Sequence, residues 1–298
     1  MIKRDFTNKI GINPCVYLSR WGEEEGFPAI RKASEQGYDL ICVPLRNLAA
    51  VDPDKTARVF AECGTSPVNT FVFALEDDIA SNDKTVSERG VSRLLEAIAK
   101  ARDMGSTFLG GPIHQALTKH AGPVDPQGVE NAMRGLDICA TEAAKSGIKL
   151  SIEVLNRYES SMINTGTQAM AFLDKIGNSN LWVHLDTYAM NIEECDMAAA
   201  IAYCMPRLAY LEIGESHRGR LGTGSVDIAG AVRAAVRAGY SGPLGYEAFS
   251  AGTSNPQLNA NLATWRTMWT DNDAAAQEAL DRIVVELNAA NASLYKLS

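Results

Sequence analysis

Four acidic residues, each at the end of an apolar segment, mark the second half of the chain: Glu153, Asp186, Glu212 and Glu247. In each segment apolar and other side chains alternate, so the acid falls on the face opposite the apolar positions. Four carboxylates that converge on one point repel one another unless a cation lies among them. Because an all-oxygen donor set suits hard divalent ions, the pattern predicts a site for Mn²⁺ or Mg²⁺, with Co²⁺ as a further candidate.

These acids suit the movement of a proton on a carbon next to a carbonyl group. Epimerisation at such a carbon requires a base on one face, an acid on the other, and positive charge to stabilise the enediolate between them. A pair of carboxylates provides the base and the acid, and Arg218 offers a second positive charge. The same groups would serve an aldose–ketose isomerase, which moves the proton between C1 and C2, so the residues leave both reactions open.

The elements that must position these acids are eight short apolar segments, each followed by a stretch with helical periodicity. They start roughly 25–45 residues apart, the length of one βα unit. The predicted strands cover residues 9–17, 38–45, 68–75, 107–113, 149–155, 181–188, 208–215 and 243–249. This pattern predicts an α/β fold, a single (β/α)8 TIM barrel over residues 8–250 with a C-terminal helical extension over residues 256–298. The acids then lie at the C-terminal ends of strands, where barrel enzymes carry their active sites.

The segments between the predicted strands are expected to be helices: residues 24–36, 54–63, 84–104, 126–146, 167–176, 195–204 and 226–238. Glycine stands just past five of them, where a left-handed C-cap would fall: Gly37, Gly105, Gly147, Gly177 and Gly239. After the last strand we expect two more helices, which cover an end of the barrel or contact another copy of the chain. Trp265 and Trp269 have the i, i+4 spacing of one helical face.

The composition argues against several classes of protein. With 46% hydrophobic and 21% charged residues among 298, the chain can bury a large core. A net charge of −8 argues against electrostatic binding of nucleic acid, and no apolar run approaches the roughly 20 residues of a membrane span. The N-terminal residues lack an apolar export segment, and the six cysteines show no CxxC pairing. We therefore expect a cytoplasmic enzyme with reduced cysteines that acts on a small molecule.

Longer motifs around the acids resemble those of the ketose 3-epimerases, the D-tagatose, D-allulose and L-ribulose 3-epimerase group of the xylose isomerase-like barrels. The resemblance rests on residues 153–159 (EVLNRYE), 185–194 (LDTYAMNIEE), 213–219 (IGESHRG) and 246–247 (YE), and it extends to residues 265–266 and 269–272. It implies an isomerase of carbohydrate metabolism that needs a divalent metal such as manganese and inverts C3 of a ketose. It also implies a homodimer or homotetramer.

The resemblance assigns roles to individual residues. It implies that Glu153 and Glu247 bind the metal and also exchange the C3 proton, from opposite faces of the sugar. Asp186 matches a third metal ligand. Glu159 and Arg218 match residues that hold the O1–O3 end of the substrate. From the residues alone, Glu159 could equally cap the following helix, and Arg218 could be a surface residue on a polar loop.

Two positions depart from the family pattern. Glu212 stands where the family has a ligand histidine, which gives four acids in place of three acids and an imidazole. Ala189 stands where the family has a histidine that contacts the substrate, and His114, after the fourth predicted strand, is a candidate to replace it or a surface loop residue. The departures leave a catalytically impaired sugar-binding barrel as an alternative. Arg220, in a Gly-rich segment, leaves a phosphorylated tetrulose or pentulose as another.

Overall fold

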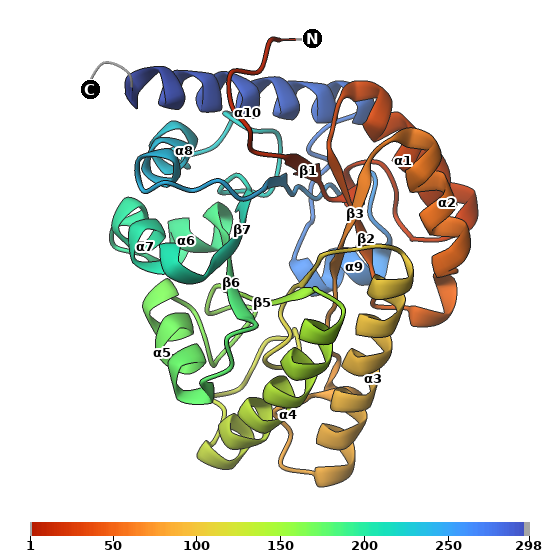
Figure 1. The fold of residues 1–298 in the computed structure, drawn as a ribbon, viewed down its shortest axis with the longest axis vertical. Helices are drawn as coiled ribbons and strands as arrows, with labels where there is room; N and C mark the ends of the chain where they lie inside the picture. The colour runs from red at the N-terminus through yellow and green to blue at the C-terminus, as the bar shows by residue number, and fades with distance from the viewer. Residues whose placement is uncertain (1, 295–298) are drawn as a thin grey trace.

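Eight parallel strands pair in chain order and close into a barrel (Figure 1). They are β1 (Ile10–Ile12), β2 (Leu40–Pro44), β3 (Ser66–Thr70), β4 (Phe108–Gly110), β5 (Lys149–Glu153), β6 (Leu181–Asp186), β7 (Leu208–Ile213) and β8 (Leu244–Tyr246). In this computed structural model, which describes residues 2–294, β1 pairs with both β2 and β8. The predicted TIM barrel is confirmed.

Helices surround the barrel and connect its strands. They are α1 (Glu23–Gln36), α2 (Pro53–Cys63), α3 (Lys84–Asp103), α4 (Pro126–Lys145), α5 (Gly166–Ile176), α6 (Thr187–Glu193), α7 (Met197–Cys204), α8 (Ile228–Arg237), α9 (Pro256–Leu262) and α10 (Asn272–Leu294). The five glycines expected at C-caps all adopt positive φ, between 67° and 101°. At these positions a side chain would be strained, so glycine ends each helix where the sequence predicted.

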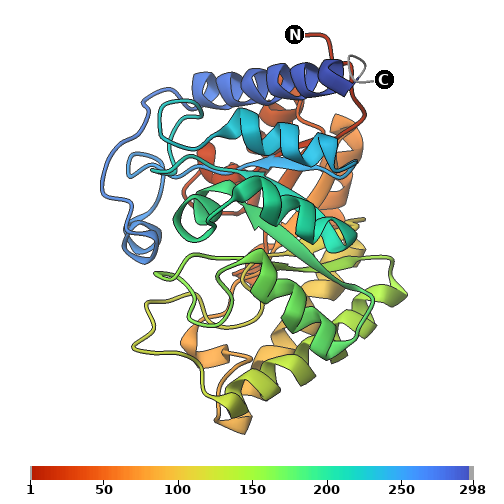
Figure 2. The ribbon, with the colours of Figure 1, turned by 90° about the vertical axis from the view of Figure 1, so that its left-hand side faces the viewer.

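The two C-terminal helices have different places in the fold. Helix α10 packs against α8, and Tyr38, just past α1, donates its hydroxyl to the Ala276 carbonyl of α10 at 2.7 Å. It therefore closes the ring of helices between α8 and α1 (Figure 1). Figure 2 shows α9 away from this ring, on the side of the barrel toward which β6 points. The expected C-terminal helices are confirmed up to Leu294, and residues 295–298 lie outside the described part of the chain.

Below the acids, the inside of the barrel is filled by aromatic rings. The rings of Phe108 and Tyr210 stack with centroids 4.9 Å apart, and the His184 ring meets Tyr210 edge-on at 5.0 Å. On β8, Gly245 leaves the space that Tyr210 and Glu212 occupy, because a Cβ there would lie 2.6 Å from Glu212 Oε1 and would also overlap the tyrosine hydroxyl. This packed layer fills the barrel beneath the acids and supports their side chains.

Several observed boundaries differ from the predicted ones. The predicted strands were too long at their C-terminal ends, because buried apolar loop residues such as Phe71 and Val154 continue the strand-like pattern beyond the last ladder pair. The helical pairing of Trp265 with Trp269 was wrong, since α9 ends at Leu262. Trp269 is buried and donates to Asn272 Oδ1 at 2.9 Å, whereas Trp265 is 70% exposed.

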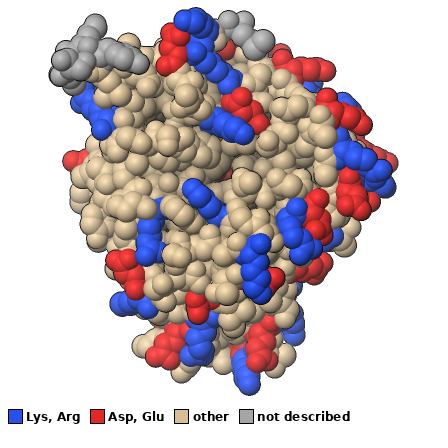
Figure 3. All heavy atoms as spheres, viewed as in Figure 1, with Lys and Arg blue, Asp and Glu red and all other residues tan. Residues whose placement is uncertain are grey.

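The surface charges, the helices and the cysteines each add one observation. On the face drawn in Figure 3, acidic and basic side chains of the described residues are intermixed. Among residues 2–294, none of the helices has the length and apolar character needed to cross a lipid bilayer. All six cysteines are free, and Cys42, Cys139 and Cys204 are buried, whereas Cys195 is exposed.

Candidate active site

Three of the four predicted acids come together at the C-terminal end of the barrel. Glu153 ends β5, Asp186 ends β6, and Glu247 follows β8 directly. One carboxylate oxygen from each lies within 4.8 Å of the others. Because successive inward positions of neighbouring strands form one layer, the alternation in the sequence was sufficient to place these side chains together.

The environment of this three-acid cluster favours a cation. Burial raises the pKa of Asp186 to about 7, and the nearby Glu247 charge adds to the increase. Burial also raises the pKa of Glu153 well above its ordinary value, and the charges of Glu247 and Asp186 add to it. Asp186 Oδ1 accepts from the Tyr188 amide at 2.9 Å, while Oδ2 is buried and has no hydrogen-bond partner among the described residues. An unpaired oxygen in an all-oxygen cluster fits a divalent metal ion.

The fourth predicted acid, Glu212, lies outside this cluster. Its Oε2 is 3.0 Å from His184 Nε2, and His184 Nδ1 is 4.0 Å from Glu153 Oε2. The imidazole therefore stands between the two glutamates, in the layer beneath the cluster. Neither nitrogen of His184 makes a well-aligned hydrogen bond within residues 2–294. The fourth-ligand role of Glu212 stays a prediction.

Glu247 is held from two sides. Asn13, just after β1, donates from Nδ2 to Glu247 Oε1 at 2.7 Å, and Arg218 Nη1 donates to Oε2 at 2.7 Å. Two charge-assisted hydrogen bonds fix the direction of the carboxylate. Asn13 was not among the predicted site residues, and the signal that could have found it is a lone polar residue just after the first strand.

Arg218 is buried and forms ion pairs with two acids of the site, so it is not a surface residue. Its backbone has a left-handed φ of 56°, which is strained for a residue with a side chain. Its Nη2 lies 3.0 Å from Glu159 Oε1, and its guanidinium lies 3.9 Å from the centre of the Tyr188 ring. Asn156 also donates to Glu159, so this glutamate takes part in the site network and does not merely cap a helix. The structure thus brings two of the three predicted substrate-binding residues, Glu159 and Arg218, next to the cluster.

His114 lies elsewhere. It is fully buried, with Nε2 3.0 Å from Ser160 Oγ, and it is not among the described residues that line the pocket below. Burial lowers the pKa of His114 to about 3, so the ring stays neutral at ordinary pH. The structure therefore places it next to Ser160, neither at the surface nor on the wall of the pocket, and its substrate-binding role stays a prediction.

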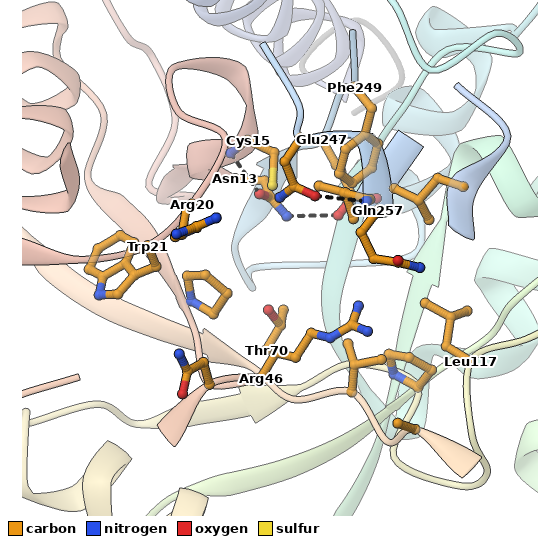
Figure 4. A pocket seen from close by; sticks show the side chains of 18 of the residues that line it. Asn13, Cys15, Arg20, Trp21, Arg46, Thr70, Leu117, Glu247, Phe249 and Gln257 are labelled. Carbon is orange, nitrogen blue, oxygen red and sulfur yellow. Dashed lines mark hydrogen bonds between the residues drawn. The ribbon is translucent and has the colours of Figure 1, made fainter. Parts of the chain in front are cut away.

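Glu153 and Glu247 line a pocket of about 600 Å³, within the range of small-molecule sites. Figure 4 shows Asn13 beside Glu247, with the labelled side chains of Arg46 and Gln257 reaching toward the same space. Gln257 and two leucines of α9 line the pocket, so this helix covers the C-terminal end of the barrel, which is one of the two roles expected for it. Arg220 is not part of this wall and pairs with Glu278, its Nε donating at 2.8 Å.

Comparisons with known proteins agree with this geometry. Residues 30–290 match the family model of the xylose isomerase-like TIM barrel. The chain is 36% identical to a ketose 3-epimerase of Arthrobacter globiformis, over 91% of this chain and 94% of the relative. It is also 36% identical to an L-ribulose 3-epimerase of Methylomonas sp. (strain DH-1), over 92% and 96% of the two chains.

Solved structures give the same answer. A structure of L-ribulose 3-epimerase superposes with a TM-score of 0.94 at 33% identity and covers 98% of each chain. A D-allulose 3-epimerase from Methylomonas sp., crystallised in complex with D-allulose, has a TM-score of 0.91 at 34% identity, covering 96% of this chain and 99% of the other. The chain belongs to the ketose 3-epimerase family of isomerases, within the xylose isomerase-like TIM barrels.

Proposed function

We propose that this protein is a metal-dependent ketose epimerase that inverts C3 through an enediolate. The observation that carries the proposal is the approach of the Glu153, Asp186 and Glu247 oxygens to within 4.8 Å of one another. Two of these acids, Glu153 and Glu247, line the pocket in which a sugar would lie. The relatives' own activities on L-ribulose and D-allulose support a ketose as the substrate class.

In the proposed reaction, Glu153 and Glu247 face opposite sides of C3. One carboxylate takes the C3 proton, and the C3–H bonding electrons form the C2–C3 double bond of the enediolate. The other acid then gives a proton to the opposite face of C3, which inverts its configuration. A bound divalent ion, held by Glu153, Asp186 and Glu247 with Glu212 as the predicted fourth ligand, would supply the positive charge that stabilises the enediolate.

Glu159 and Arg218 are proposed to hold the O1–O3 end of the sugar. Arg218 forms ion pairs with both Glu159 and Glu247. A sugar hydroxyl bound by Glu159 and Arg218 would therefore lie next to Glu247, a proposed acid–base residue. Because the guanidinium is buried, its charge is weakly screened and can favour negative charge that develops on the substrate oxygens. Asn13 donates a hydrogen bond to the other oxygen of Glu247, so the two bonds together restrict the orientation of the carboxylate.

The experiment follows deuterium into a ketose dissolved in D₂O. Protein stripped of metal and then supplied with Mn²⁺ is expected to place deuterium at C3 of D-allulose or L-ribulose. The Glu153→Gln and Glu247→Gln variants are expected to lose this exchange, whereas Glu278→Gln, which changes an exposed glutamate, should retain it. Deuterium at C1 instead would assign aldose–ketose isomerisation, and binding of ketose without exchange would assign a sugar-binding barrel.

Some features stay predictions. The ion is expected to be Mn²⁺ or Mg²⁺, with Co²⁺ as a further candidate, because the donor atoms are all oxygen. A homodimer or homotetramer and a cytoplasmic location also remain expectations. The exposed Trp265, three residues past α9, is the first residue at which a contact between copies should be sought.

A further inference from the structure

The pocket has a second wall with a different chemistry from the wall of acids. Arg20, after β1, and Arg46, after β2, both line it, and Arg93 of α3 joins them. In a closed barrel of eight strands, β2 lies across the axis from β6, which carries Asp186. Arg46 thus follows the strand opposite β6, and Arg20 follows the neighbouring strand β1.

One of these arginines already has its partners. Arg93 pairs with the buried Asp77 and also donates to the Arg46 carbonyl at 2.9 Å. Its charge is therefore largely compensated within the protein, and its hydrogen bond fixes the backbone from which Arg46 projects. Arg93 thus stabilises this part of the pocket and does not provide an unpaired charge to a ligand.

Arg46 and Arg20 are different. Both are exposed, and neither side chain makes a hydrogen bond or ion pair with any residue between 2 and 294. Figure 4 shows the Arg46 side chain directed toward the middle of the pocket and Arg20 at its edge beside Trp21. Glu76 also lines this side, so the two free guanidinium groups outnumber the acid there. In a chain with a net charge of −8, two uncompensated cations on one pocket wall point to a ligand and not to general surface charge.

We propose that Arg46 and Arg20 bind an anionic group, a phosphate monoester or a carboxylate, at the end of the ketose remote from C3. A guanidinium is always charged and presents a planar fork of N–H donors that matches both anions. The inference rests on the proposed function, because the sugar must place C3 at Glu153 and Glu247 for its far end to reach these arginines. The sequence suggested that Arg220 binds a phosphate, but Arg220 pairs with Glu278. We therefore assign anion binding to Arg46 and Arg20 instead.

A matched series of ketoses tests the proposal. D-Fructose, D-fructose 6-phosphate and D-fructuronate share the configuration of their middle carbons and end in a hydroxymethyl, a phosphate and a carboxylate. Deuterium exchange at C3 is expected to have a kcat/KM about tenfold or more higher for a charged member than for D-fructose. Whichever charged member is faster identifies the anion. Equal rates for all three would overturn the proposal and leave the epimerase function intact.

Variants assign the effect to the arginines. Arg46→Gln and Arg20→Gln are each expected to reduce the preference for the charged ketose, Arg46→Gln by about tenfold. Arg220→Gln is the matched control: it removes a charge that pairs with Glu278 and should keep the preference of the wild type. If Arg46→Gln lowers kcat/KM equally for the charged and the neutral ketose, the anion site does not exist.

Binding of inorganic phosphate separates this proposal from the proposed function. Calorimetry with the metal-loaded protein is expected to show phosphate binding to the wild type and to Arg220→Gln, and at least about tenfold weaker binding to Arg46→Gln. This result does not depend on catalysis, so it would stand even if D-allulose and L-ribulose showed no exchange at C3 and the epimerase function failed. Phosphate binding that is absent, or that is unchanged in Arg46→Gln, would overturn the anion site.

Discussion

Asn13 and Glu247 are joined by a hydrogen bond of 2.7 Å between Asn13 Nδ2 and Glu247 Oε1. The bond connects the loop after β1 to the residue that follows β8, across the seam at which the barrel closes. It orients Glu247, one of the two proposed acid–base residues, from the side of β1. Asn13 is thus a positioning residue for the proposed reaction.

Replacing Asn13 tests this role. Asn13→Ala is expected to lower kcat for C3 exchange by about tenfold to a hundredfold, because a hydrogen bond to a charged group contributes about 1.5–3 kcal/mol. KM should change much less, since Asn13 acts through Glu247. Asn131→Ala, which removes an amide that donates to the Ser81 carbonyl, is the control and should retain kcat. A wild-type kcat in Asn13→Ala would rule out the positioning role.

Arg218 forms two buried ion pairs in the site, and we expect their loss to destabilise the fold. Arg218→Met leaves Glu159 and Glu247 without their shared cation, and it is expected to reduce the free energy of unfolding by about 3–5 kcal/mol. Arg220→Met removes the exposed pair with Glu278 and should reduce it by about 1 kcal/mol or less. Denaturant unfolding of both variants measures the difference, and equal losses would contradict the buried network.

His114 should affect stability at acidic pH. Its folded-state pKa of about 3 lies below the ordinary value of 6.5, so the unfolded chain binds an extra proton between these pH values. The free energy of unfolding therefore falls as the pH decreases through this window, by up to about 1.4 kcal/mol per pH unit from this residue.

Two measurements check the His114 prediction. His114→Gln should show a smaller loss of stability between pH 6.5 and pH 5 than the wild type. NMR of histidine-labelled protein should show a His114 ring that does not titrate between pH 8 and pH 5. A His114 resonance that titrates near pH 6.5 would mean that the ring is not held in this buried, neutral state.

The packing under the acids predicts the effect of a single methyl group. Gly245→Ala places a Cβ against the Tyr210 hydroxyl and 2.6 Å from Glu212 Oε1. We expect a loss of about 1–3 kcal/mol in the free energy of unfolding, partly restored in the Gly245→Ala, Tyr210→Phe double variant. Gly22→Ala, where a Cβ meets nothing within 4 Å, is the control and should stay within about 0.5 kcal/mol of the wild type. A Gly245→Ala variant as stable as the control would show that this layer is looser than described.

The sequence predicted the barrel and the meeting of three acids because both depend on alternation. A strand places every second residue inside the barrel, so Glu153, Asp186 and Glu247 needed only the correct register. The same parity says nothing about the direction of a side chain within its layer. For that reason it could not show that the Glu212 carboxylate approaches His184, two residues before Asp186 on the neighbouring strand.

Other features were beyond sequence reasoning for different physical reasons. Asn13 stands alone after a strand of three residues, and only closure of the barrel brings it to Glu247. The charge on the pocket wall comes from Arg20 and Arg46, which lie in separate loops that share no motif. The Arg220 charge, which was visible in a Gly-rich segment, turned out to be neutralised by Glu278 on α10.

Binding of Mn²⁺ to protein that has been stripped of metal tests the proposed metal site most directly. We expect about one tightly bound ion per chain in the wild type, loss of tight binding in Asp186→Asn, and C3 exchange only in the loaded protein. Mass spectrometry of the metal content, with exchange measured on the same samples, gives both answers. A stripped wild type that binds no ion while Glu212→His does, or that exchanges C3 equally without metal, would contradict this expectation.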